Sequence, residues 1–211
     1  FGGGHAGYPA NDVEIFDSST NTWNQQTQPE GFPICCNYSF ISTCPSGSAE
    51  ATACGALSGS DPTVDTPTGH PYTLHTFQKA VYNPLLNKFV QYTATGIWTY
   101  DANTKIWNKD IPLVSTIDTS ATAIDYDSSL QTEILIQGAS QRKIYKVDHT
   151  AGRLVFLAGY GDPVTAGSMV PYAWSEMHMA YDPDRRLHLI FLESPGVAAD
   201  SHYWLFDSIA F

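Results

Sequence analysis

The stretch Asn11-Asp12-Val13-Glu14-Ile15-Phe16-Asp17-Ser18-Ser19-Thr20-Asn21-Thr22-Trp23 decides the fold of this chain. Val13 and Ile15 alternate with polar residues, which is the period of a half-buried β-strand. Asp17 opens a run of Ser, Thr and Asn, which favour tight turns because their short side chains bond nearby backbone groups. Trp23 begins a second extended run. The stretch therefore predicts a β-hairpin whose turn starts at Asp17.

The same pattern returns three times further along the chain. In the second copy a Trp again stands six positions after the Asp, and in the third copy Leu154 takes that position. The fourth copy runs into the last residues. The copies span residues 96–107, 143–154 and 202–208, and their Asp residues follow one another at spacings of 84, 47 and 59. Repeats at such spacing indicate an array of equal units, one of which carries an insertion.

Each of the three later copies is preceded by a similar introduction and an apolar run. The introductions are Lys-Ala-Val-Tyr-Asn-Pro at 79–84, Ala-Ile-Asp-Tyr-Asp-Ser at 123–128 and His-Met-Ala-Tyr-Asp-Pro at 178–183. The apolar runs occupy 89–92, 134–136 and 187–192. A full unit therefore predicts four antiparallel strands, which we name a, b, c and d in chain order.

With its Gly2-Gly3-Gly4 run ahead of Val13, Asp17 and Trp23, the first unit resembles a kelch repeat. In that family a glycine doublet ends strand b, and an Asp–turn–Trp link joins strands c and d. Two of the Asp spacings lie near the kelch period of roughly 50 residues. The resemblance covers nearly everything except residues 28–72. It implies an all-β fold, a β-propeller of the type in kelch proteins and in the central domain of galactose oxidase-like proteins, with blades near 1–27, 73–111, 116–159 and 174–211.

Both ends of the chain cut through a unit. Phe1 enters at strand b, and Phe211 follows Asp207 before the expected Trp position. One interpretation, which we favour, is that the chain is a piece of a larger propeller with six or seven blades, as kelch relatives usually have. The alternative is a complete ring of four blades, in which strands from the two ends share one blade.

The composition excludes two classes of partner. The formal net charge is −11, and the 10 Lys and Arg residues are scattered singly, so no basic stripe exists for nucleic acid or an anionic membrane. No apolar run is long enough to span a bilayer. The hydrophobic content of 43% is sufficient for a substantial core. We find no cofactor or metal motif.

Residues 28–72 are predicted to form an inserted loop that holds all four cysteines. Cys35 and Cys36 are adjacent and would bond each other only under strain, so we expect one to pair with Cys44 and the other with Cys54. Free thiols are the alternative, and a zinc site lacks the needed C-x-x-C spacing. Two disulfides would indicate a secreted or extracellular protein. Asn37 matches a glycosylation sequon, which also arises by chance.

The loops before strand a and between strands b and c of a propeller open on one face, where ligands are usually held. Counting back seven places from the tyrosines of the introductions gives three equivalent positions on this predicted mouth. Residues beside the starts of the a strands and residues of the b–c loops complete the predicted mouth. The predicted mouth residues are His5, Tyr72, His75, Thr119, Arg142, Trp174, Glu176, Glu193 and His202. Aromatic rings that stack on sugars, together with charged side chains that bond hydroxyl groups, favour a carbohydrate ligand.

Several conspicuous residues have a structural interpretation instead. Trp23, Trp98 and Trp107 are expected to pack within the blades, and His178 and His188 to lie in strands as core or interface histidines. The Asp residues of the repeats are expected to cap turns, and Asp182 to open a hairpin turn rather than a calcium loop.

The sequence therefore predicts a secreted or cell-surface binding module, with a carbohydrate or protein partner. Three enzyme classes are weighed against it. A copper-radical oxidase would use Tyr72 and His75 but lacks an assignable second Tyr and His, and a polysaccharide lyase could use those residues with Arg142. A sialidase is disfavoured because its Asp boxes have a different spacing. A further alternative is a structural subunit that forms homo-oligomers through the edges of the cut blades.

Overall fold

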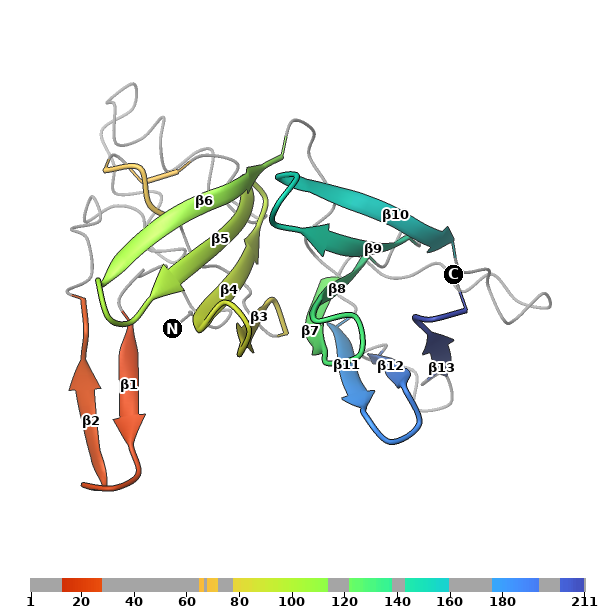
Figure 1. The fold of residues 1–211 in the computed structure, drawn as a ribbon, viewed down its shortest axis with the longest axis horizontal. Coiled ribbons are helices and arrows are strands. Elements are labelled where there is room, and N and C mark those ends of the chain that lie inside the picture. The colour runs from red at the N-terminus through yellow and green to blue at the C-terminus, as the bar shows by residue number, and fades with distance from the viewer. Residues whose placement is uncertain are drawn as a thin grey trace, which may run out of the picture.

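The computed structural model describes residues 13–27, 65–66, 68–71, 78–113, 122–137, 143–159, 176–193 and 202–210. Over these ranges the fold is all-β, with thirteen strands in four antiparallel sheets and no helix (Figure 1). In these same ranges no helix exists that is long and apolar enough to cross a bilayer. The prediction of an all-β fold is confirmed.

Successive strands pair with one another in every sheet. Sheet 1 contains β1 (Glu14–Asp17) and β2 (Thr22–Gln25). Sheet 2 contains β3 (Ala80–Asn83), β4 (Lys88–Thr93), β5 (Gly96–Asp101) and β6 (Ile106–Pro112). Sheet 3 contains β7 (Thr122–Asp127), β8 (Thr132–Gln137), β9 (Lys143–Asp148) and β10 (Arg153–Gly159). Sheet 4 contains β11 (Glu176–Asp182), β12 (Leu187–Glu193) and β13 (His202–Asp207).

The a–b and c–d hairpin turns that the structure describes share one construction. An Asp or Asn ends the first strand, and its side-chain oxygen accepts backbone N–H groups two or three residues further on, as Asp101 does from Asn103 over 2.8 Å. The last turn residue has a φ between 54° and 61°. The capping residues are Asp17, Asn83, Asp101, Asp127, Asp148 and Asp182. The predicted capping roles and the hairpin turn at Asp182 are confirmed.

The sheets follow one another face to face, with apolar side chains between them. We call the face of a sheet that is directed toward the next sheet its forward face, and the opposite face its rear face. Three apolar clusters result. Val13 packs on Trp98, Tyr100 and Trp107 of sheet 2; Val90, Tyr92, Ile97 and Ile111 of sheet 2 pack on Ile124, Leu135 and Val147; and Ala123, Ile134, Ile136 and Ile144 pack on Met177, Met179, Ile190 and Phe206 of sheet 4.

The first strands of sheets 2, 3 and 4 lie side by side, although each belongs to a different sheet. The N–H of Ile124 in β7 donates to the carbonyl of Gln78, just before β3, over 2.8 Å. In β11, the N–H of Met179 donates to Oε1 of Gln78, and that of Tyr181 donates to Oδ2 of Asp125 over 2.8 Å. These bonds satisfy N–H groups of the edge strands β7 and β11 that have no partner within their own sheets.

The expectation for Trp23 is wrong. Trp98 and Trp107 are buried as expected, with 2% and 7% of their surface exposed, but Trp23 is 68% exposed. Its ring contacts Phe16 at a centroid distance of 5.2 Å. The physical reason is that no described strand covers the rear face of sheet 1, so the aromatic side chain at this repeat position lacks the preceding sheet that buries Trp107.

Candidate functional site

Three of the predicted mouth residues lie in described strands. Glu176 begins β11, Glu193 ends β12 and His202 begins β13. The strand register pairs Glu176 with Glu193, and Leu192 with His202, so these positions gather at one end of sheet 4. The following predicted residues lie outside the described part of the chain: His5, Tyr72, His75, Thr119, Arg142, Trp174, the cysteines Cys35, Cys36, Cys44 and Cys54, and Asn37.

A buried polar network crosses the boundary between sheets 2 and 3. Asn83, at the end of β3, donates its amide N–H to Oε1 of Glu133 in β8 over 2.7 Å. The other carboxylate oxygen of Glu133 lies 2.8 Å from Nε2 of His149, and Nδ1 of His149 lies 3.1 Å from Oδ2 of Asp110 in β6. Thr99 donates to the remaining oxygen of Asp110 over 3.1 Å. The network therefore links strands of both sheets through one imidazole ring.

His149 is held in its charged form. Burial by itself opposes the charge, but hydrogen bonds and attraction from Asp110 and Glu133 raise the pKa of His149 from 6.5 to about 9. For Asp110, burial favours the neutral acid, yet the bonds from His149 and Thr99 lower its pKa. Both ring nitrogens of His149 donate to carboxylates, so this residue can neither accept a proton as a general base near neutral pH nor bind a metal.

A second network crosses the boundary between sheets 3 and 4. Asp127 ends β7 at the position that Asn83 holds in sheet 2. Its Oδ2 lies 3.1 Å from Nε2 of His188 in β12 and also accepts a bond from the hydroxyl of Ser208. Burial lowers the pKa of His188, and the attraction of Asp127 only partly opposes this effect. Burial raises the pKa of Asp127, but the bonds from Ser208, Leu130 and His188 outweigh it and lower the pKa. A neutral imidazole thus donates to an ionised carboxylate.

Asp127, His188 and Ser208 have the composition of a catalytic triad but not its connectivity. A nucleophilic serine needs its hydroxyl bonded to the histidine, which in turn is oriented by the acid. Here both Ser208 and His188 donate to the same oxygen of Asp127. All three are buried, with exposures of 0%, 0% and 3%. The arrangement joins sheets and does not activate the serine. The expectation that His188 is an interface histidine is confirmed.

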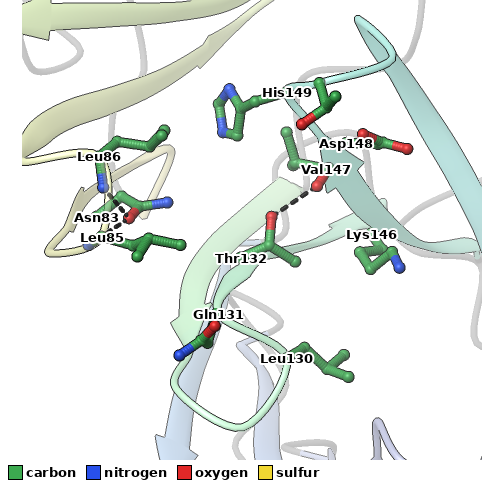
Figure 2. Close-up of a pocket in the computed structure, with 11 residues that line it drawn as sticks. Asn83, Leu85, Leu86, Leu130, Gln131, Thr132, Lys146, Val147, Asp148 and His149 are labelled. Atoms are coloured by element: carbon green, nitrogen blue, oxygen red, sulfur yellow. Dashed lines mark hydrogen bonds between the residues drawn. The ribbon is translucent and has the colours of Figure 1, made fainter.

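A pocket of about 240 Å³ lies between sheets 2 and 3, at the end of the sheets that carries the a–b and c–d turns (Figure 2). Some of its polar groups bond one another: Asn83 Oδ1 accepts the N–H groups of Leu85 and Leu86, and the Thr132 hydroxyl donates to the Val147 carbonyl over 2.6 Å. The ring of His149, at its rim, is engaged as described above. This end of the sheets is opposite the one that holds Glu176, Glu193 and His202.

Sequence reasoning missed Asp110, Glu133 and His149. They come from three different segments, and only their meeting in space gives them a shared role. One signal was available in the repeat: His149 directly follows the turn residue Asp148, as Ser208 follows Asp207 and Ser18 follows Asp17. At the boundaries between sheets 2 and 3 and between sheets 3 and 4, this position contacts a buried carboxylate, whereas Ala102 holds it in sheet 2.

Comparison with known proteins adds no relative to this description: no family model matches the chain, and no curated protein matches it.

Proposed function

We propose that this chain forms a kelch-like β-propeller, or part of one, and acts as a secreted or cell-surface binding module with carbohydrate as its ligand class. The observation that carries the proposal is the meeting of β3, β7 and β11, the first strands of three successive sheets. In a propeller the sheets surround a central channel, and their innermost strands are neighbours around it. Face-to-face packing of each sheet on the next supports the same architecture.

Binding is favoured over catalysis by the state of the described ionisable groups. The charged His149 is locked between two carboxylates, and the neutral His188 donates to Asp127. Both histidines join sheet boundaries: His188 is fully buried, and both ring nitrogens of His149 are bonded to carboxylates. Among the described residues, no group of three or more His, Cys, Asp or Glu side chains is arranged to hold a metal ion.

A sugar suits the residues of the predicted mouth. Tyr72 and Trp174 offer ring faces for stacking, and Arg142 offers a planar donor for a hydroxyl or a carboxylate. The common location of Glu176 and Glu193 at one end of sheet 4 supports a mouth at this end, because strand a begins there and strand b ends there. Carboxylate groups accept hydrogen bonds from sugar hydroxyls.

An array of neutral and uronic acid-containing oligosaccharides tests the proposal with the full chain. We expect binding by the wild type and at least a tenfold loss in the His75→Ala and Trp174→Ala variants, since each removes a ring from the mouth. Leu85→Ser is the matched control, because Leu85 is exposed in an a–b turn at the opposite end. Failure to bind any sugar, or unchanged binding by both mouth variants, would contradict the proposal.

The location and the alternative activities need separate measurements. Intact mass under reducing and non-reducing conditions is expected to show two disulfides, and four thiols would remove the basis for a secreted protein.

Incubation with uronate polysaccharides, followed by absorbance of unsaturated products, tests the lyase alternative. If the wild type releases such products and the His75→Ala variant does not, the function is catalysis and not binding alone.

A further inference from the structure

Two apolar sheet faces are exposed at opposite sides of the described fold. On the forward face of sheet 4, Leu189, Phe191 and Leu205 are 44%, 37% and 63% exposed. On the rear face of sheet 1, Phe16 is 44% and Trp23 is 68% exposed. Figure 1 shows β1 and β2 on one side of the molecule and β13 on the other. Exposed apolar surface of this kind marks an interaction site.

The forward face of sheet 4 is exposed, whereas the equivalent forward faces of sheets 2 and 3 are buried. Leu189 is the third residue of β12, and the third residues of β4 and β8 are Val90 and Ile134. Val90 and Ile134 are both 0% exposed, because the following sheet packs on them. The fifth residues of the same strands follow the same rule, with Phe191 exposed where its counterparts are buried. Sheet 4 therefore presents the surface on which a further sheet packs.

The rear face of sheet 1 carries a pair of aromatic side chains whose counterpart in sheet 2 is buried by a neighbouring sheet. The Phe16 and Trp23 rings are directly paired across β1 and β2, 5.2 Å apart at 51°. Tyr100 and Trp107 form the same cross-strand pair in β5 and β6, 5.1 Å apart at 50°. The second pair is buried, with exposures of 1% and 7%, beneath Val13. The first pair has the same geometry without a covering sheet.

An identical tripeptide shows how the two exposed faces match. Phe206-Asp207-Ser208 joins sheet 4 to the forward face of sheet 3: Phe206 packs in the apolar cluster there, and the Ser208 hydroxyl donates to Asp127. Sheet 1 carries Phe16-Asp17-Ser18 at the same place in the repeat.

The forward face of sheet 4 offers the partners that this tripeptide needs. Leu189 and Phe191 lie where the apolar partners of Phe206 lie in sheet 3. Asp182 ends β11 as Asp127 ends β7, and its Oδ2 is bonded to the exposed Arg185, over 2.6 Å, rather than to a neighbouring sheet. Phe16 thus fits Leu189 and Phe191, and the Ser18 hydroxyl fits Asp182.

We propose that sheet 1 of one chain docks on sheet 4 of a second copy, so that two chains form a head-to-tail dimer. A second copy is favoured over closure within one chain because Val13 anchors sheet 1 to sheet 2, on the side of the molecule away from sheet 4. The contact continues the sheet-to-sheet interface already present inside the chain. Two copies would bring together the four described sheets of each chain, eight in all, which is within the range of four to eight blades that propellers adopt. This proposal goes beyond the binding function and does not depend on a ligand.

Sedimentation velocity of the full chain over a range of concentrations tests the proposal. We expect a dimer in the wild type, and at least a roughly tenfold weaker association in Phe16→Glu and in Leu189→Lys, since each places a charge in the apolar contact. Leu85→Ser is the control, because Leu85 is 61% exposed but lies in a turn outside both faces. It is expected to dimerise like the wild type. A wild-type chain that remains monomeric at every concentration overturns the proposal. This includes a monomer in which sheet 1 packs on sheet 4 of the same chain.

Mixing the two variants separates loss of contact from misfolding. In a mixed dimer, the unchanged sheet 1 of the Leu189→Lys chain meets the unchanged sheet 4 of the Phe16→Glu chain. The other contact holds both substitutions and becomes an ion pair. We expect the mixture to dimerise at concentrations at which each variant by itself is monomeric. A mixture that stays monomeric overturns the head-to-tail geometry.

Discussion

Nδ1 of His149 lies 3.1 Å from Oδ2 of Asp110, and this contact joins the turn between β9 and β10 to β6 of the preceding sheet. Together with the bond to Glu133 it keeps the imidazole protonated in the folded state. The contact makes the boundary between sheets 2 and 3 sensitive to alkaline pH.

The free energy of unfolding is expected to fall between pH 6.5 and 9. The folded pKa of His149, about 9, is above the unfolded value of 6.5, so its stabilising contribution is complete below pH 6.5 and is lost as pH rises through 9. The loss is on the order of 3 kcal/mol. Urea unfolding at several pH values measures it. His149→Gln should remove the decline, whereas His178→Gln, on β11, should retain it; a decline that persists in His149→Gln would contradict the assignment.

The acidic limb of the stability profile is expected to come from His188. Its folded pKa is lowered by burial, so the native state binds fewer protons than the unfolded chain, and stability falls as pH drops below 6.5. Unfolding measured between pH 5 and 6.5 tests this direction. A His188→Gln variant keeps a donor for Asp127 and should flatten this limb while leaving the alkaline limb intact. An unchanged acidic limb would show that other groups control it.

Replacing Asp127 by Ala is expected to cost about 2–4 kcal/mol, and by Asn about 1–2 kcal/mol. Both changes remove the ionised acceptor shared by His188 and Ser208. Asn still caps the turn, as Asn83 does in sheet 2, by accepting the N–H groups of the two turn residues. The midpoints of urea unfolding measure the difference. Equal losses in the two variants would indicate that the capping bonds contribute nothing.

Gly96→Ala is expected to destabilise the fold by roughly 2–3 kcal/mol. A Cβ atom at this position would lie 2.5 Å from the backbone carbonyl oxygen of Ile111, which sheet pairing prevents from moving away. Gly69→Ala is the matched control, because a Cβ there meets open space and only the φ of +82° resists it. We expect a cost near 1 kcal/mol for the control in thermal unfolding. Similar losses for both would contradict the steric explanation.

Local features of this fold could be predicted from the sequence. The turn at Asp101 is an example, because the bond from the Asn103 N–H to its carboxylate spans two residues and forms in any chain with that local pattern. The strands around Val90 and Ile134 were likewise readable, since each is a short apolar run between turn residues.

The contacts between sheets could not be predicted in the same way. The bond from Asn83 to Glu133 joins residues 50 positions apart, and the one from Asp127 to His188 joins residues 61 positions apart. Trp23 and Trp107 occupy the same place in the repeat, yet one is exposed and the other is buried. The difference depends on whether a preceding sheet is present, and no local pattern encodes this.

The amino-acid sequence by itself determined the hairpins, their capped turns and the apolar runs of their strands, because these depend on residues that are close together in the sequence. The tertiary structure decided which faces are buried, which histidine is charged and which carboxylates hold adjacent sheets together. Those properties arise when distant segments exclude water from between them, since only then do burial and paired charges shift protonation and fix each side chain in place.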